Sequence, residues 1–148
     1  MRREAAKDGE GRVAFAVKAA IADAGAKTFS LRAQKTMYGG KAIAVGDTVY
    51  LFASETHGGA GLIGKGIVTA ADHAGVKKPG GVARCTPRVS IEVTRTASAK
   101  RPLGRAQLRP FIGKGGVRGE LADRFYKQAT DKIIGLSDAA AAWLEGWV

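Results

Sequence analysis

An eight-residue segment from Gly25 to Arg32, which reads Gly-Ala-Lys-Thr-Phe-Ser-Leu-Arg, constrains the fold of this chain more than any other stretch. From its fourth residue onward, polar and apolar residues alternate. Such alternation predicts a strand, because successive side chains of a strand point to opposite faces. Phe29 and Leu31 then share an apolar face, and the opposite face carries Thr28, Ser30 and Arg32. We therefore expect a strand that is anchored on one side and presents a cation and two hydroxyls on the other.

Further strands are indicated by runs of β-branched and aromatic residues that are bounded by turn residues. They are predicted at residues 12–17, 48–53, 62–69, 88–96 and 132–136. The stretch 88–96 alternates apolar and polar residues along its length, which is typical of a strand with one buried face. With 148 residues, the chain has the length of one domain with a core of its own.

Helices are predicted between some of these strands. The alanine-rich residues 17–24 favour a helix that ends at Gly25, since glycine enters the left-handed backbone region without steric cost. Shorter helical stretches are predicted within 102–108 and 120–129, and Ser137 has the character of an N-cap for a terminal helix over 138–147. Residues 33–44, 72–87 and 113–119 are expected to be loops. The pattern as a whole predicts the α+β class.

Positive charge is concentrated in one part of the chain. The formal net charge is +11, and residues 77–118 contain 11 basic and 1 acidic side chains, which gives 11 − 1 = +10 for that segment alone. Arginines outnumber lysines there, and arginine favours bidentate phosphate contacts and stacking on bases. The arginines are Arg84, Arg88, Arg95, Arg101, Arg105, Arg109 and Arg118. A concentrated basic segment of this kind predicts a polyanion partner, and nucleic acid is favoured over a membrane because no lipid-binding helix accompanies the charge.

Several other classes of function are disfavoured. The single cysteine, Cys85, leaves no internal disulfide and no cysteine zinc cluster. His57 and His73 stand in polar loops without metal-ligand spacing, so no metal site is expected. Residues 59–66 fit a G-x-G-x-x-G pattern and nearly fit a P-loop, but Gly66 follows the lysine where Mg²⁺ binding needs a hydroxyl. A close approach between strands explains these glycines better.

The segment from Gly25 to Arg32 resembles the G-x-K-x-x-x-x-R motif of the ASCH domain, a member of the PUA-like superfamily of small β-barrels linked to RNA. Two later segments, at residues 45–52 and 62–68, resemble strands of PUA-like domains in the expected order. The EVE domain is the close competitor, on the resemblance of residues 100–103 and 128–143. Phe15 stands where EVE domains carry an early tryptophan. The resemblance implies a single PUA-like domain over residues 12–148, a curved and mostly antiparallel barrel with flanking helices, preceded by a flexible stretch at residues 1–11.

The resemblance and the charge together imply a nucleic-acid-binding module, with RNA as the expected polymer. The candidate nucleic-acid-binding residues are the motif cations, neighbouring residues and the basic segment: Lys27, Arg32, Lys35, Tyr38, Arg84, Arg88, Arg101, Arg105, Arg109, Lys114 and Arg118. Tyr38 follows the motif strand in a glycine-bearing loop, where its ring is a candidate platform for a base. Residues 113–119 combine glycines with Lys114 and Arg118, which suits backbone contact with phosphate and equally suits a flexible connection.

A second function implied by the resemblance is enzymatic. Some small ASCH proteins are amidohydrolases that act on acylated nucleosides, and the resemblance gives Lys27 and Ser30 the catalytic positions. A lysine in a pocket loses its proton more readily and then activates a hydroxyl. Glu92 and Glu120 are the candidate acidic partners. Ribonuclease activity is a third and weaker alternative, because no histidine lies in the motif.

Other expectations concern partners and location. No cofactor is expected. Trp143 and Trp147 form one helical stripe that suits core or dimer packing better than a base platform. The sequence is therefore compatible with a homodimer as well as with a monomer. No apolar run reaches the roughly 18–20 residues that span a bilayer, and no apolar stretch follows the N-terminal arginines, so a cytoplasmic protein is expected.

Overall fold

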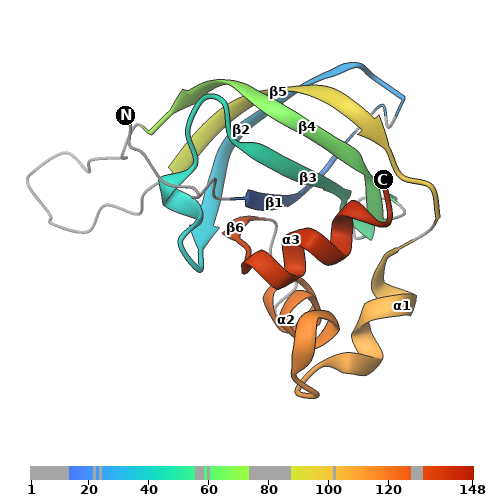
Figure 1. Cartoon of the computed structure of the whole chain (residues 1–148). Helices are drawn as coiled ribbons and strands as arrows, with labels where there is room; N and C mark the ends of the chain where they lie inside the picture. Colours follow the sequence, from blue (N-terminus) through green and yellow to red (C-terminus); the bar gives the residue numbers. More distant parts are fainter. Residues whose placement is uncertain are drawn as a thin grey trace, which may run out of the picture.

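The computed structural model describes residues 14–21, 23, 25–55, 59, 61–73, 88–101, 103–127 and 132–148. Its strands close into a barrel in the order β1-β3-β4-β5-β2-β6 (Figure 1). They are β1 (Ala14–Ala19), β2 (Thr28–Met37), β3 (Thr48–Ala53), β4 (Gly61–Asp72), β5 (Arg88–Ser98) and β6 (Lys132–Gly135). Neighbouring strands are antiparallel, except that β1 is parallel to β3 and β2 is parallel to β6. The expected curved, mostly antiparallel barrel is confirmed.

Helices flank the barrel, which confirms the α+β class. They are η2 (Gly40–Ala42), α1 (Arg105–Leu108), η4 (Arg109–Phe111), α2 (Gly116–Phe125) and α3 (Asp138–Glu145). In Figure 1, α2 and α3 lie together on one side of the barrel, and α1 follows the chain that leaves β5. Ser137 caps α3 as expected, because its hydroxyl accepts a hydrogen bond from the Ala140 N–H at 3.1 Å. None of the described helices is long and apolar enough to cross a membrane.

Two apolar cores stabilise this arrangement, one inside the barrel and one between the barrel and the helices. β3 contributes to both, since Val49 and Leu51 point inward whereas Tyr50 and Phe52 point toward the helices. A strand covered on both faces reads as a continuous apolar run, and this accounts for the sequence of β3. The second core holds α2 and α3 against the barrel wall, where Phe52 and Phe125 pack with their ring centroids 4.8 Å apart.

The two faces of the motif strand are confirmed. Phe29 and Leu31 are buried in the barrel core, and Thr28, Ser30 and Arg32 are exposed on the outer surface. The strand is longer than predicted, however, and residues 33–37 belong to β2 instead of a loop. A bulge at Ala33, whose φ is +51°, interrupts the alternation and leaves polar residues that read as a loop. Beyond the bulge, Gln34 and Lys35 still pair with β5, and residues 35–37 pair with β6 on the other edge of β2.

Two sequence predictions about helices are wrong. The alanine-rich stretch predicted as a helix from residue 17 instead supplies the end of β1, in which Val17 pairs with Leu51 of β3 and Ala19 pairs with Ala53. Burial on both sides overrides the helix propensity of alanine there. Residues 113–119 are also not all loop, because α2 begins at Gly116. Glycine is a poor helix former, so the sequence pattern placed this boundary too late.

The glycines in residues 59–66, the segment that fits a G-x-G-x-x-G pattern, allow neighbouring strands to approach closely, as expected. A Cβ on Gly64 would lie 2.2 Å from the Ala97 carbonyl oxygen of β5, and a Cβ on Gly66 would lie 2.4 Å from the Thr94 carbonyl oxygen. Both glycines lie in β4, where a P-loop would require the start of a helix. The expected flexible stretch at residues 1–11 and most of the predicted loop at 72–87 lie outside the described residues.

Candidate nucleic-acid interface

Five side chains stack in a continuous series on the helices that cover one side of the barrel. We call α1, η4, α2 and α3, with the segments that connect them to the barrel, the helical region. The Arg101 guanidinium carbon lies 4.2 Å from the ring centroid of Trp147, and the Trp147 centroid lies 5.2 Å from that of Trp143. On the other side of Trp143, the Arg118 guanidinium lies 5.4 Å from its centroid and also 5.3 Å from the centroid of Phe111. We call Arg101, Trp147, Trp143, Arg118 and Phe111 the cation–aromatic row.

The row is assembled from four separate elements. Trp143 lies in the last turn of α3, and Trp147 lies in the turn that follows the end of this helix at Glu145. Arg118 comes from α2, Phe111 from η4, and Arg101 from the segment after β5. The three rings are partly exposed and pack against the second core, whereas both arginines are exposed. The row is therefore a surface feature with an apolar support beneath it.

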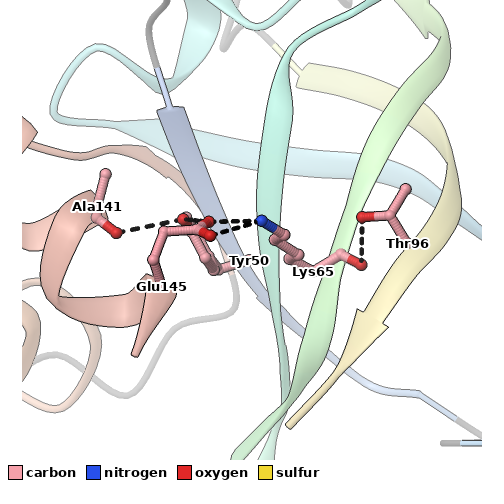
Figure 2. Close-up of polar contacts among 5 residues, drawn as sticks. All are labelled: Tyr50, Lys65, Thr96, Ala141 and Glu145. Carbon is pink, nitrogen blue, oxygen red and sulfur yellow. Dashed lines mark hydrogen bonds and ion pairs between the residues drawn. The ribbon is translucent and has the colours of Figure 1, made fainter. Parts of the chain in front are cut away.

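A polar clamp holds α3 against the barrel next to the row (Figure 2). The Glu145 carboxylate accepts hydrogen bonds from the Tyr50 hydroxyl of β3 and from the Lys65 ammonium of β4, the latter at 2.7 Å to each oxygen. The Tyr50 hydroxyl also lies 3.2 Å from the Ala141 carbonyl oxygen. Burial, reinforced by the hydrogen bond and charge of Glu145, raises the pKa of Tyr50 well above its usual value. Partial burial raises the pKa of Glu145, but the hydrogen bonds from Lys65 and Tyr50 lower it more, and the net change is downward.

This clamp predicts an acid-dependent contribution to stability. Because the pKa of Glu145 is lower in the folded protein than its ordinary value of 4.5, its contribution is complete above that pH and is lost as the pH falls through the folded value. The Glu145 side chain is about half exposed, so Glu145→Gln should cost only about 0.5–1 kcal/mol at pH 7. Urea unfolding of both proteins from pH 7 to pH 3 would measure this. A difference in stability that stays constant down to pH 3 would contradict the ionic role of Glu145.

The row leaves charged donors exposed at the surface. A guanidinium stacked on a ring keeps its N–H donors in its own plane, where they remain available for bidentate contact with phosphate. One Arg101 nitrogen, Nη2, donates to the Gly146 carbonyl oxygen at 3.1 Å, and this bond fixes the side chain over Trp147. Within the described part of the chain, Arg118 stacks on two rings and pairs with no carboxylate. Both arginines were predicted from the sequence as nucleic-acid-binding residues.

Three further predicted cations lie on neighbouring segments of the same helical region. Arg105 of α1 and Arg109 of η4 line a surface hollow of about 770 Å³ together with Glu55 and Gln107. Glu55 is held in place there, because it accepts a 2.6 Å hydrogen bond from the Arg105 backbone N–H. Arg105, Arg109 and Lys114 are exposed. The helical region thus combines five of the predicted cations with partly exposed aromatic rings.

The motif residues form a separate and smaller site on the outer face of the barrel. Ser30 and Arg32 line a hollow of about 230 Å³ with Asp72 and Glu92. Glu92 stands directly opposite Ser30 in the β2–β5 ladder, so the structure places this carboxylate beside the motif. Lys27 is exposed and is not part of the lining. The structure therefore brings Ser30, Arg32 and Glu92 together, but not Lys27.

The remaining predicted residues lie elsewhere. Lys35 and Arg88 face each other across β2 and β5, where an Arg88 nitrogen donates to the Ala33 carbonyl oxygen at 3.3 Å. Tyr38 follows β2, and its ring is contacted by Arg124 of α2. Arg84 lies outside the described residues. Glu120, the other candidate acid, accepts hydrogen bonds from the N–H and hydroxyl of Ser137, away from the motif hollow.

The prediction that Trp143 and Trp147 pack against the core is confirmed, because both are partly buried against the second core. The sequence does not predict their contacts with Arg118 and Arg101, or the part of Phe111 in the row. The signal that was present is the combination of a four-residue tryptophan spacing with arginines at 101 and 118, but the pairing of these segments depends on tertiary structure. Lys65 and Glu145, which position the tryptophan helix, carried no local signal.

Comparison with known proteins supports the fold. No protein-family model and no curated protein matches the chain. Similar solved structures include a hypothetical protein from Leishmania major, with 17% identity, a TM-score of 0.57, and coverage of 91% of this chain and 93% of that chain. The DUF55 domain of human thymocyte nuclear protein 1 has 12% identity, a TM-score of 0.59 and coverage of 90% and 96%. The human THYN1 protein in complex with 5-methylcytosine-containing DNA has 12% identity, a TM-score of 0.56 and the same coverage.

This chain has a PUA-like fold. The closed six-stranded barrel with helices on one side and the similarity to the DUF55 domain over nine-tenths of the chain agree on this point. At 12–17% identity, the likeness concerns the fold alone.

Proposed function

We propose that this protein is a nucleic-acid-binding module, with RNA as its expected polymer, and that the helical region carries its interface. The observation that carries the proposal is the cation–aromatic row. Stacked arginines supply phosphate contacts, and partly exposed rings supply surfaces for unpaired bases, which is the combination found in proteins that bind single strands. Arg105, Arg109 and Lys114 extend the positive surface beyond the row.

A solved structure of similar fold and the motif resemblance both support this proposal. The human THYN1 protein, which has a similar fold, has been crystallised in complex with 5-methylcytosine-containing DNA. The G-x-K-x-x-x-x-R resemblance to ASCH domains points to RNA, and we place the chain near the ASCH and EVE branches of the PUA-like superfamily on that ground. A role in nucleic-acid binding is common to both lines of support, whereas the choice of RNA over DNA rests on the resemblance.

The test is a binding titration with fluorescently labelled single strands of RNA and DNA of the same sequence. We expect both to bind at low salt and RNA to bind more tightly. The logarithm of the association constant should fall linearly with the logarithm of the salt concentration, by about 0.7 for each phosphate contact. No binding to either strand at low salt would contradict the proposal, and tighter binding of DNA would contradict the choice of RNA.

A second candidate function is the amidohydrolase activity on acylated nucleosides. The observation that favours it is the position of Glu92 opposite Ser30, which supplies a carboxylate beside the motif hydroxyl. The exposure of Lys27 and its absence from the lining of the hollow weigh against it, because activation of a serine by lysine requires the two groups to meet. We therefore rank this function below nucleic-acid binding.

Ser30→Ala separates the two candidates. We expect it to change nucleic-acid affinity by about tenfold or less, because Ser30 contributes at most one hydrogen bond worth roughly 0.5–1.5 kcal/mol. We also expect no release of free nucleoside when the unmodified protein is incubated with N-acylated nucleosides. Thr28→Ala is the matched control, since Thr28 is exposed on the same face of β2. Hydrolysis that falls by several orders of magnitude in Ser30→Ala but not in Thr28→Ala would establish the enzyme instead.

A further inference from the structure

A second hollow near the helical region combines an exposed aromatic ring with a helix N-terminus. Its volume is about 400 Å³, which is within the range of about 300–1,000 Å³ typical of small-ligand sites. Tyr38, which follows β2, lines one part of it, and residues of α2 and its two ends line the rest. The lining residues are Tyr38, Gly115, Gly116, Glu120, Asp123, Arg124 and Lys127.

The Tyr38 ring is held in position although it is exposed. Its exposed fraction is 48%, which is unusual for a large aromatic side chain. The Arg124 guanidinium stacks on it at 4.7 Å from the ring centroid. Arg124 is itself fixed, because it donates a 2.6 Å hydrogen bond to the Gly135 carbonyl oxygen and pairs with Glu120 at 3.3 Å. An exposed ring that is already immobilised binds a stacking partner at a lower entropic cost.

The N-terminus of α2, which also lines the hollow, suits an anion. Gly115 and Gly116 open the ten-residue helix α2, and no side chain caps this end. A Cβ on either glycine would meet no atom within 4 Å, so the backbone here borders open space. Uncapped N–H groups at a helix N-terminus attract phosphate.

The two carboxylates of the hollow have different surroundings. Glu120 is engaged by Arg124 and by Ser137. Asp123 accepts a 2.8 Å hydrogen bond from the Gly113 N–H through one oxygen, which leaves its second oxygen as a further acceptor. A carboxylate at this place disfavours a second phosphate and favours a donor such as an exocyclic amino group.

We propose that this hollow binds one unpaired nucleotide, with its base stacked on Tyr38 and its phosphate at the N-terminus of α2. The proposal rests on the proposed function, because it names a subsite for one nucleotide of a bound single strand. Asp123 adds a preference for bases that carry an amino group, such as adenine or cytosine, over uracil. Tyr38 is then a binding residue that supplies stacking and no charge.

The experiment compares Tyr38→Ala and Tyr38→Phe with the unmodified protein. Each is titrated with an oligoadenylate of about eight nucleotides and with a strand of the same length that lacks all of its bases. We expect Tyr38→Ala to weaken oligoadenylate binding by about 5- to 100-fold, as loss of one stacking contact does, and to leave the baseless strand unaffected. Tyr38→Phe keeps the ring and should retain affinity within about twofold. Oligouridylate should bind more weakly than oligoadenylate.

Each alternative outcome has a distinct meaning. If the unmodified protein binds neither strand, the proposed function fails and this subsite fails with it. If it binds oligoadenylate and Tyr38→Ala binds equally well, only the subsite is overturned. An equal loss on the baseless strand would also overturn it, because the effect would then not come from a base. Circular dichroism of Tyr38→Ala establishes that the barrel is retained.

Discussion

Replacing Arg101, Arg105 and Arg109 together by glutamine is expected to weaken single-strand binding by about 100-fold at 0.1 M salt. The three side chains are exposed; Arg101 belongs to the cation–aromatic row, and Arg105 and Arg109 line the larger hollow. Each phosphate contact contributes about 0.7 to the slope of log affinity against log salt, so three lost contacts lower the slope by about 2. Over the tenfold interval from 1 M to 0.1 M salt, that difference amounts to about two logarithmic units.

The matched control for this variant is the triple substitution of the same arginines by lysine. Lysine keeps the charge and loses the planar fork, so the salt slope should stay while affinity falls by a smaller factor. A triple glutamine variant whose slope equals that of the unmodified protein would show that these arginines do not contact phosphate.

Gly66→Ala is expected to destabilise the fold strongly. A Cβ at this position would lie 2.4 Å from the Thr94 carbonyl oxygen and 2.6 Å from Val93 Cγ1, both in the neighbouring strand β5. β4 is hydrogen-bonded on both sides, to β3 and β5, so it cannot move away from one neighbour without disturbing the other. We expect a loss of about 3 kcal/mol, at the upper end for overpacking, and a fall in Tm of about 10 °C.

Gly146→Ala is the control for that substitution. Gly146 has φ −73° and ψ −10°, a helical conformation open to alanine, and its added Cβ would come no closer than 3.4 Å to the Trp143 carbonyl oxygen. Its stability should be unchanged or raised by about 0.4–1 kcal/mol. Thermal unfolding followed by circular dichroism measures both variants. Equal Tm values for Gly66→Ala and the unmodified protein would contradict the close approach of β4 and β5.

Much of the barrel could be predicted because its strands carry local patterns. The alternation around Phe29 and the apolar run of β3 report directly which faces are buried, and residues 48–53 match β3 at both ends. The patterns failed where contacts between distant segments of the chain determine the local secondary structure. Val17 and Ala19 lie in an alanine-rich stretch that favours a helix, yet both are buried in a barrel strand. The bulge at Ala33 was also invisible, since nothing local marks a residue that adopts a positive φ without being glycine.

The candidate site could be predicted only in part. Charge is a local property, so Arg101 and Arg118 were recognised as candidates from the basic segment. Their stacking on Trp147 and Trp143 joins residues that are 46 and 25 positions apart (147 − 101 and 143 − 118), and no spacing in the sequence encodes it. Conversely, the motif around Lys27 was conspicuous in the sequence, but the structure leaves Lys27 outside the hollow that holds Ser30.

The most direct test of the central claim is the intrinsic tryptophan fluorescence of the protein during titration with a single strand. The chain contains two tryptophans, Trp143 and Trp147, and both belong to the cation–aromatic row. Their emission therefore reports on the proposed interface without any label. If nucleic acid binds along the row, we expect saturable quenching with the same dissociation constant as the anisotropy titration, and its loss at high salt. A strand that binds by anisotropy but leaves the tryptophan emission unchanged would contradict the claim that the row is the interface.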